Sequence, residues 1–231
     1  MMTVLRHILD QVEPVFKENP HRFFTEHDIH SELALITTNL LSNEGSLFVK
    51  TKDGNQVGRV HHEYPTPFRC LMEHYNFRMV TENEFKREKL KNPRFAAKRG
   101  RIDLVVLNSD YVSSNTLNIV SGKRYKDLLE SATQQKFPAL DLAIEVVYHP
   151  TMDERPQAGI MKRRVESIVQ DYEKLLALMK FRQIDDLPFC KEAAMLFFSN
   201  TGYRVELERT LSSIKTDEKV SLSSFICPKT A

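Results

Sequence analysis

The sequence of 231 residues has little of what builds loops, cross-links or membrane spans. Seven glycines and ten prolines argue against a loop-rich or low-complexity chain. Its three cysteines, Cys70, Cys190 and Cys227, form no C-x-x-C pair, which disfavours a disulfide framework and a zinc site. The longest apolar runs, such as residues 193–199, are too short to span a bilayer. We therefore expect a cytoplasmic protein without a membrane partner.

Composition and length point to one globular domain. A hydrophobic content of 41% with 28% charged residues is ordinary for a folded protein. The chain is long enough to bury a substantial core, and it contains no internal repeat and no clear linker. The first residues carry acids at amphipathic spacing rather than the apolar block of a signal peptide, so they predict a helix. We expect a single domain over residues 1–231.

The hydrophobic pattern predicts alternating helices and strands. Pro14 is expected to disturb the end of the first helix, and a capping box of Thr25 and Asp28 opens the second. The first strand is expected to end at Pro65 and Pro67. The expected helices span residues 3–17, 25–41, 160–180 and 203–214, with a short one around 123–133, and the expected strands span 57–64, 101–108, 142–148 and 193–198. This order predicts an α/β or α+β sheet flanked by helices.

Two acidic residues interrupt apolar strands. The period of two puts Asp103 on one strand face with Val105 and Leu107, and Glu145 on one face with Ala143. Charged groups in buried strands are costly unless they are paired or bound to a metal. Either acid on its own is explained if it caps the edge of the sheet or pairs with a buried arginine. Two such strands favour a functional carboxylate pair, and hard oxygen ligands suit Mg²⁺ or Mn²⁺.

These residues resemble the PD-(D/E)XK nuclease superfamily. Its core is a helix, a three-strand meander, a helix and a fourth strand, which matches residues 25–200. Asp103 stands at the motif aspartate, Glu145 at the acid of E-x-K, and Glu32 at the acid of the preceding helix. Glu63 opens an E-Y-P segment similar to a turn in some members. Residues 1–24 then form an N-terminal helix, and residues 203–231 a C-terminal helix and tail.

The resemblance implies a restriction-endonuclease-like mixed central sheet flanked by helices, in a single α/β domain. It also implies a Mg²⁺- or Mn²⁺-dependent nuclease that acts on phosphodiester bonds of DNA. Asp103 and Glu145 would bind the metal, with Glu32 or Glu63 assisting. A homodimer is compatible with this expectation.

Val147 occupies the position of the motif lysine. In active members that lysine orients the attacking water, which valine cannot do, although some members carry the lysine on the next helix. Taking Met161 as zero at about 100° per residue, Lys174 falls near 220° and is expected to point to solvent. Lys162 falls near 100°, at the edge of the apolar stripe, and is the better candidate for the catalytic lysine.

A strongly basic stretch precedes the strand of Asp103. Net charge is only +2, yet residues 85–101 hold eight basic residues and one acid, Glu88. The stretch is either a solvated surface or an electrostatic footprint for a phosphate backbone, and its position favours the second. The expected nucleic-acid-binding residues are Lys86, Arg87, Lys89, Lys91, Arg94, Lys98, Arg99 and Arg101.

Three functions remain open from the sequence. The first is a metal-dependent nuclease in which Asp103, Glu145 and Lys162 are catalytic. The second is a catalytically inactive relative that serves as a nucleic-acid-binding or assembly module. The third is an unrelated α/β protein whose two acids are structural and lie far apart.

Overall fold

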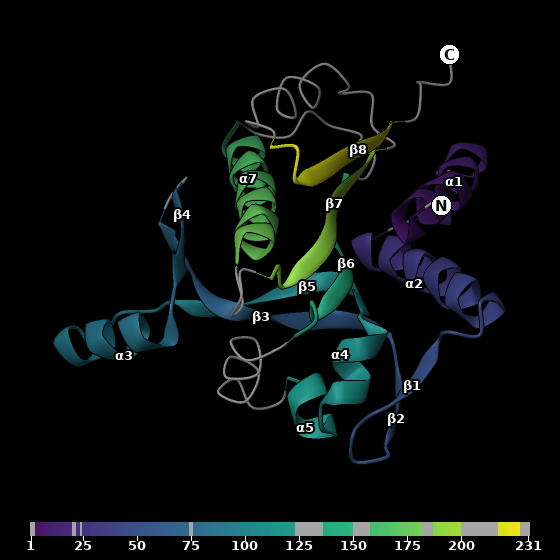
Figure 1. The fold of residues 1–231 in the computed structure, drawn as a ribbon. Coiled ribbons are helices and arrows are strands. Elements are labelled where there is room, and N and C mark those ends of the chain that lie inside the picture. Colours follow the sequence, from purple (N-terminus) through teal and green to yellow (C-terminus); the bar gives the residue numbers. More distant parts are fainter. Residues whose placement is uncertain are drawn as a thin grey trace.

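A mixed six-stranded sheet organises the chain, and Figure 1 shows helices on both of its faces. The computed structural model describes residues 3–19, 22–23, 25–73, 76–122, 136–149, 158–181, 187–199 and 217–226. The strand order is β4-β3-β5-β6-β7-β8. The strands are β3 (Val60–Glu73), β4 (Asn76–Val80), β5 (Lys98–Leu107), β6 (Leu140–His149), β7 (Cys190–Ser199) and β8 (Val220–Ile226).

The sheet changes from antiparallel to parallel at β6. Strands β4, β3, β5 and β6 pair antiparallel, whereas β7 pairs parallel with both β6 and β8. The helix α7 (Ala158–Lys180) joins β6 to β7, as a parallel connection requires. The predicted sheet flanked by helices is therefore confirmed as a mixed α/β arrangement.

Each face of the sheet has its own hydrophobic core. Val105 and Ala143 face α7 and pack with Tyr172 and Leu175 of that helix. On the other face, Ile144 and its neighbours pack against α1 (Val4–Glu18) and α2 (Glu26–Asn43). This division follows from the alternation of side chains along β5 and β6. Asp103 and Glu145 share the parity of Val105 and Ala143, and Glu145 contacts α7 through Lys174, whereas Asp103 contacts the N–H of Val146 and His30 of α2.

Of the two expectations about proline, one is wrong. The expected helix over residues 3–17 is α1, which contains Pro14 near its end and stops at Glu18. Strand β3 does not end at Pro65 and Pro67 but runs through both. Its register with β5 shifts between Pro65 and Arg69, and such an irregularity accommodates residues that donate no ladder hydrogen bond. The capping box of Thr25 and Asp28 at the start of α2 is confirmed.

Several elements carried too short a pattern to be expected. They are the hairpin of β1 (Phe48–Lys50) and β2 (Gln56–Gly58), strands β4 and β8, and the helices α3 (Glu82–Lys91), α4 (Ser109–Ser114) and α5 (Leu117–Val120). The helices expected at 123–133 and 203–214 lie outside the described residues. Within the described part, no helix is long and apolar enough to cross a membrane.

Candidate active site

Strands β5 and β6 separate at Asp103 and Glu145. Their antiparallel pairing runs from Leu107–Leu140 to Leu104–Ile144, and the next pair in that register would be Asp103 and Glu145. Beyond that point, β6 continues to pair with β7 through His149. The separation of the two strands leaves one edge of β6 without a strand partner in the described sheet. Asp103 and Glu145 lie at the point where β5 and β6 separate.

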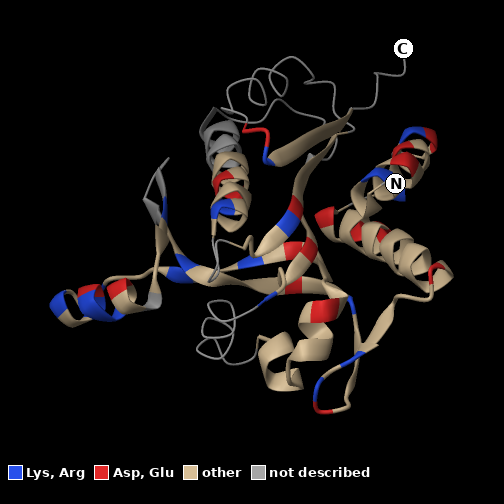
Figure 2. Ribbon diagram, viewed as in Figure 1, with Lys and Arg blue, Asp and Glu red and all other residues tan. Residues whose placement is uncertain are grey.

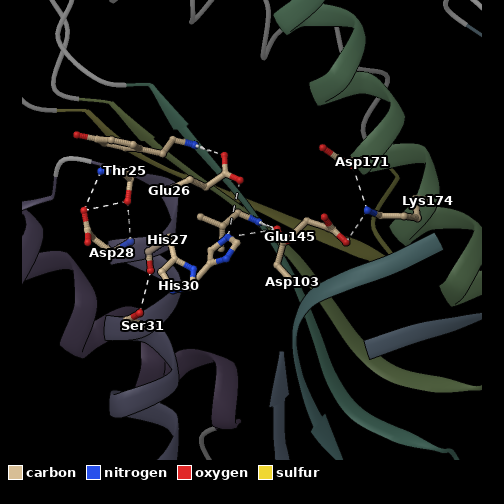
Figure 3. A network of polar contacts seen from close by, with 12 residues as sticks. Thr25, Glu26, His27, Asp28, His30, Ser31, Asp103, Glu145, Asp171 and Lys174 are labelled. Carbon is tan, nitrogen blue, oxygen red and sulfur yellow. Dashed lines mark hydrogen bonds and ion pairs between the residues drawn. The ribbon is translucent and has the colours of Figure 1, made fainter. Parts of the chain in front are cut away.

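Carboxylates from two elements satisfy the open edge of β6. Asp103 accepts a hydrogen bond from the backbone N–H of Val146 at its Oδ2 atom, over 2.8 Å. Glu26, the first residue of α2, accepts from the N–H of Tyr148 over 3.4 Å. Figure 3 shows both acids directed into the same space from opposite sides. Burial raises the pKa of Glu26, and the charge of Asp103 raises it further.

Lys174 of α7 joins this group. Its Nζ lies 2.9 Å from Oε1 of Glu145 and 3.1 Å from Oδ1 of Asp171, and its side chain is 10% exposed. Figure 3 shows Lys174 and Asp171 approaching Glu145 from the α7 side. The expectation that Lys174 points to solvent is therefore wrong.

The helical wheel misplaced Lys174 because α7 buries a wide arc near its C-terminal end. Leu178 is fully buried, and it lies only about 40° from Lys174 around the helix. Lys174 thus stands at the edge of the buried arc, and its long aliphatic stem carries the ammonium over to Glu145.

The pocket is strongly polarised. Glu145 is only 2% exposed, and burial raises its pKa well above the ordinary value while the Lys174 ammonium acts in the opposite direction. Burial also raises the pKa of Asp171. Burial alone would lower the pKa of Lys174, but its two carboxylate partners outweigh that effect and raise it. Lys174 therefore stays protonated throughout the physiological pH range.

These side chains line one cavity of about 290 Å³. The cavity is bounded by Glu26, Asp103, Glu145, Val146, Val147, Tyr148, Ser167, Ile168, Asp171 and Lys174. Asp103 and Glu145 thus line the same cavity, contrary to the expectation that structural acids of an unrelated protein would lie far apart.

His30 of α2 lies beside the cavity. Its Nε2 is 3.6 Å from Oδ2 of Asp103 and 4.0 Å from Oε1 of Glu26. Burial lowers the pKa of His30, whereas the Asp103 charge raises it. Nε2 of His30 is a buried atom without a hydrogen-bond partner among the described groups, whereas Oε1 of Glu145 has the ammonium of Lys174 at 2.9 Å. Unsatisfied buried polar atoms in a polar cavity are typical of a site for a water, an ion or a polar ligand.

The structure does not bring the other two expected metal ligands to this cavity. Glu32 pairs with Arg22 over 2.6 Å and lines a separate depression. Glu63 is exposed at a positive φ of 52° and pairs with Arg101 over 3.4 Å. The carboxylate from α2 is instead Glu26.

The pattern of α2 contained the signal for Glu26. The buried residues Ile29, Leu33 and Thr37 centre the apolar stripe about 40° past Ile29. Glu26 falls near that centre at about 60°, whereas Glu32 falls about 100° away from it. If the apolar stripe is extended toward the N-terminus of α2 instead of toward its C-terminus, it includes Glu26, the first residue of the helix.

The remaining expected residues whose side chains the structure describes do not line the cavity. Lys162 falls in α7, where its side chain lies outside the described part, as does that of Arg99. The other basic residues are exposed on α3, on the segment after it and on β5. Figure 2 shows blue lysine and arginine segments along α3, which projects beyond the β3–β4 side of the sheet. They do not line the cavity of Asp103 and Glu145.

No group of three or more histidine, cysteine, aspartate or glutamate side chains within the described ranges is arranged to hold a metal ion. Mg²⁺, however, is commonly held by one or two carboxylates, with waters and substrate oxygens completing its shell. Asp103 and Glu145, two carboxylates at one cavity, fit that smaller requirement. No family model matches the sequence, and neither a curated protein nor a solved structure matches the chain.

Proposed function

We propose that this chain is a metal-dependent nuclease that cleaves phosphodiester bonds of DNA. The observation that carries the proposal is the ion pair of Lys174 with Glu145, in the cavity that also contains Asp103. Val147 was the main argument against catalysis, because valine cannot orient water. Lys174 supplies a protonated amine at the same carboxylate from the neighbouring helix.

The order of elements supports a restriction-endonuclease-like fold. A helix (α2), an antiparallel meander (β3, β5, β6), a crossover helix (α7) and a parallel strand (β7) follow one another along the chain. The PD-(D/E)XK core has the same order. A shared fold alone does not license a reaction, so the function depends on the cavity.

Asp103 and Glu145 are the residues that would hold Mg²⁺ or Mn²⁺ in this proposal. Such an ion activates water and stabilises the leaving oxygen in phosphodiester cleavage. The chain's own residues prepare the site for it. Asp103 is fixed by the N–H of Val146, and Glu145 is held at the strand split by its ion pair with Lys174. Glu145 would share its carboxylate between Lys174 and the cation.

Lys174 acts as the positively charged group beside the scissile phosphate. Its hydrogen bond to Asp171 keeps the ammonium at the cavity when Glu145 turns to another cation. The ammonium can then donate to the attacking water or to a phosphate oxygen. A fixed positive charge in such a site typically accelerates the reaction by about 10²–10³-fold.

The experiment is cleavage of labelled single-stranded, double-stranded and branched DNA with Mg²⁺ or Mn²⁺. Asp103→Asn and Glu145→Gln are expected to reduce the rate by at least about 10²-fold. Glu13→Gln serves as the control, because Glu13 is an exposed acid of α1 whose partner is Lys17. The proposal fails if no substrate is cut with either metal, or if Asp103→Asn retains wild-type activity.

A non-catalytic DNA-binding module is the second candidate, and the exposed basic residues of α3 and β5 favour it. It predicts salt-dependent DNA binding without turnover, weakened by charge reversal at Lys86, Lys89 and Lys98. Absence of binding at low salt would remove this candidate.

A further inference from the structure

Helix α3 is held to the protein by one side only. Thr81 caps its first turn by accepting a hydrogen bond from the N–H of Glu84. Phe85 packs on a small core formed by Leu71, Val80 and Ala97. The guanidinium of Arg69 lies 4.0 Å from the centre of the Phe85 ring. Figure 1 shows the rest of α3 projecting away from the sheet.

The opposite face of α3 carries a leucine among basic residues. At about 100° per residue, Leu90 lies about 140° from Phe85 around the helix, and Lys86 and Arg87 lie at about 100° and 200°. The residue exposure of Leu90 is 86%, the highest of the large hydrophobic residues in the described part of the chain. Leu90 is exposed and has cationic side chains on both sides, so it does not stabilise the described fold.

Two of the three acids of α3, Glu84 and Glu88, already pair with basic residues, and the side chain of the third, Glu82, lies outside the described part. Glu84 pairs with Arg78, on the strand before the helix. Glu88 pairs with Arg87 over 3.3 Å and with Lys91 over 3.2 Å. Exposed pairs of this kind contribute little free energy, so phosphate oxygens can replace Glu88 as the partner of both cations. The outward face is therefore complementary to a polyanion that also offers an apolar contact.

We infer that α3 enters the major groove of duplex DNA, with Leu90 against the C5-methyl groups of thymine and the cations against the flanking phosphates. The major groove of B-DNA, about 12 Å wide, admits an α-helix, and the thymine methyl is the apolar group that it presents. Duplex RNA has a major groove too narrow for side chains to read, and a single strand has none.

This inference names the substrate form of the proposed nuclease and rests on that proposal for the reaction. β5 leads from the region of α3 to the cavity. It begins at Lys98, seven residues after the last residue of α3, and Asp103 follows five residues later, about 17 Å along the strand. That distance corresponds to about five base pairs of B-DNA.

The test measures binding by fluorescence anisotropy in EDTA, so that cleavage plays no part. Wild-type protein is titrated with a thymine-containing duplex, the same duplex with uracil in place of thymine, duplex RNA and single-stranded DNA. We expect the thymine duplex to bind best, and each contacted methyl group to contribute about fourfold in affinity. Leu90→Ala should bind the thymine and uracil duplexes equally.

Leu117→Ala is the matched control, because Leu117 is another partly exposed leucine, on α5. It should keep the wild-type preference for thymine. Equal affinity of the wild-type protein for both duplexes would overturn the inference, as would a preference that survives Leu90→Ala. Tighter binding to single-stranded DNA, to duplex RNA or to phosphatidylserine vesicles would also overturn it.

The two proposals can fail separately. Cleavage without thymine discrimination refutes the role of α3 and leaves the nuclease intact. If the protein discriminates thymine but cleaves no DNA with any metal, the nuclease proposal is refuted and α3 remains a DNA-binding element.

Discussion

Replacing Lys174 with methionine removes the cation of the cavity and keeps most of the side-chain volume. In the wild-type protein, its ammonium lies between Glu145 and Asp171 and opposes the rise that burial causes in the pKa of both carboxyl groups. In Lys174→Met, Glu145 remains 2% exposed without a cationic partner. The pKa of Glu145 in the folded state must then rise further above its ordinary value of 4.5.

A raised carboxyl pKa makes stability depend on pH in a definite direction. Below pH 4.5 the carboxyl of Glu145 is protonated in the folded and the unfolded variant alike, so the lost ion pair costs little. Above that pH the unfolded chain releases the proton and the folded variant keeps it. The wild-type protein shares this loss of stability up to its own raised pKa, so the deficit of the variant against the wild type opens above that pH, by up to about 1.4 kcal/mol per pH unit, until the pKa of the folded variant is reached. Near pH 8 we expect a deficit of about 3 kcal/mol, as for other broken buried pairs.

Urea denaturation at pH 5 and pH 8 measures this deficit. Lys180→Met is the control on the same helix, since Lys180 is 52% exposed and pairs with Asp217 over 3.4 Å, a pair worth below about 1 kcal/mol. Adding Glu145→Gln to Lys174→Met should remove most of the pH dependence. Equal deficits at both pH values, or no deficit at pH 8, would refute the assignment of Lys174 as the partner of a buried Glu145.

Two further substitutions test the fold around the site. Gly100→Ala would place a Cβ 2.8 Å from buried side-chain atoms. Thermal unfolding should therefore show that the free energy of unfolding falls by about 1–3 kcal/mol. Gly58→Ala, whose nearest contact would be at 3.6 Å, should lower the free energy of unfolding far less. Arg59→Met removes a buried arginine that pairs with Asp141 over 2.5 Å and should cost about 3 kcal/mol in urea. Arg101→Met, at an exposed pair, should cost below about 1 kcal/mol; similar losses in both arginine variants would contradict this account.

Much of the central sheet was predictable because its strands are buried on both faces. The β-branched runs around Asp103 and Glu145 give β5 and β6, and the period of two places both acids on the α7 face. The capping box at Thr25 gives the start of α2. These features are local, so the sequence alone carries them.

Other features depend on contacts between distant segments. The course of β3 through Pro65 depends on a register shift against β5, which no pattern within β3 encodes. The position of Lys174 depends on how far α7 covers the split between β5 and β6. A helical wheel assumes one narrow apolar stripe and therefore misplaces a long side chain at the stripe's edge. Asp171 was passed over for the same reason, although it lies one turn from Lys174.

The most direct test of the proposed active site is the cleavage rate of Lys174→Met beside that of Lys180→Met, on the best DNA substrate with Mg²⁺. We expect Lys174→Met to lose at least about 10²-fold in rate, while Lys180→Met stays within about twofold of the wild-type protein. Wild-type cleavage by a folded Lys174→Met variant would contradict the claim that Lys174 takes the place left by Val147.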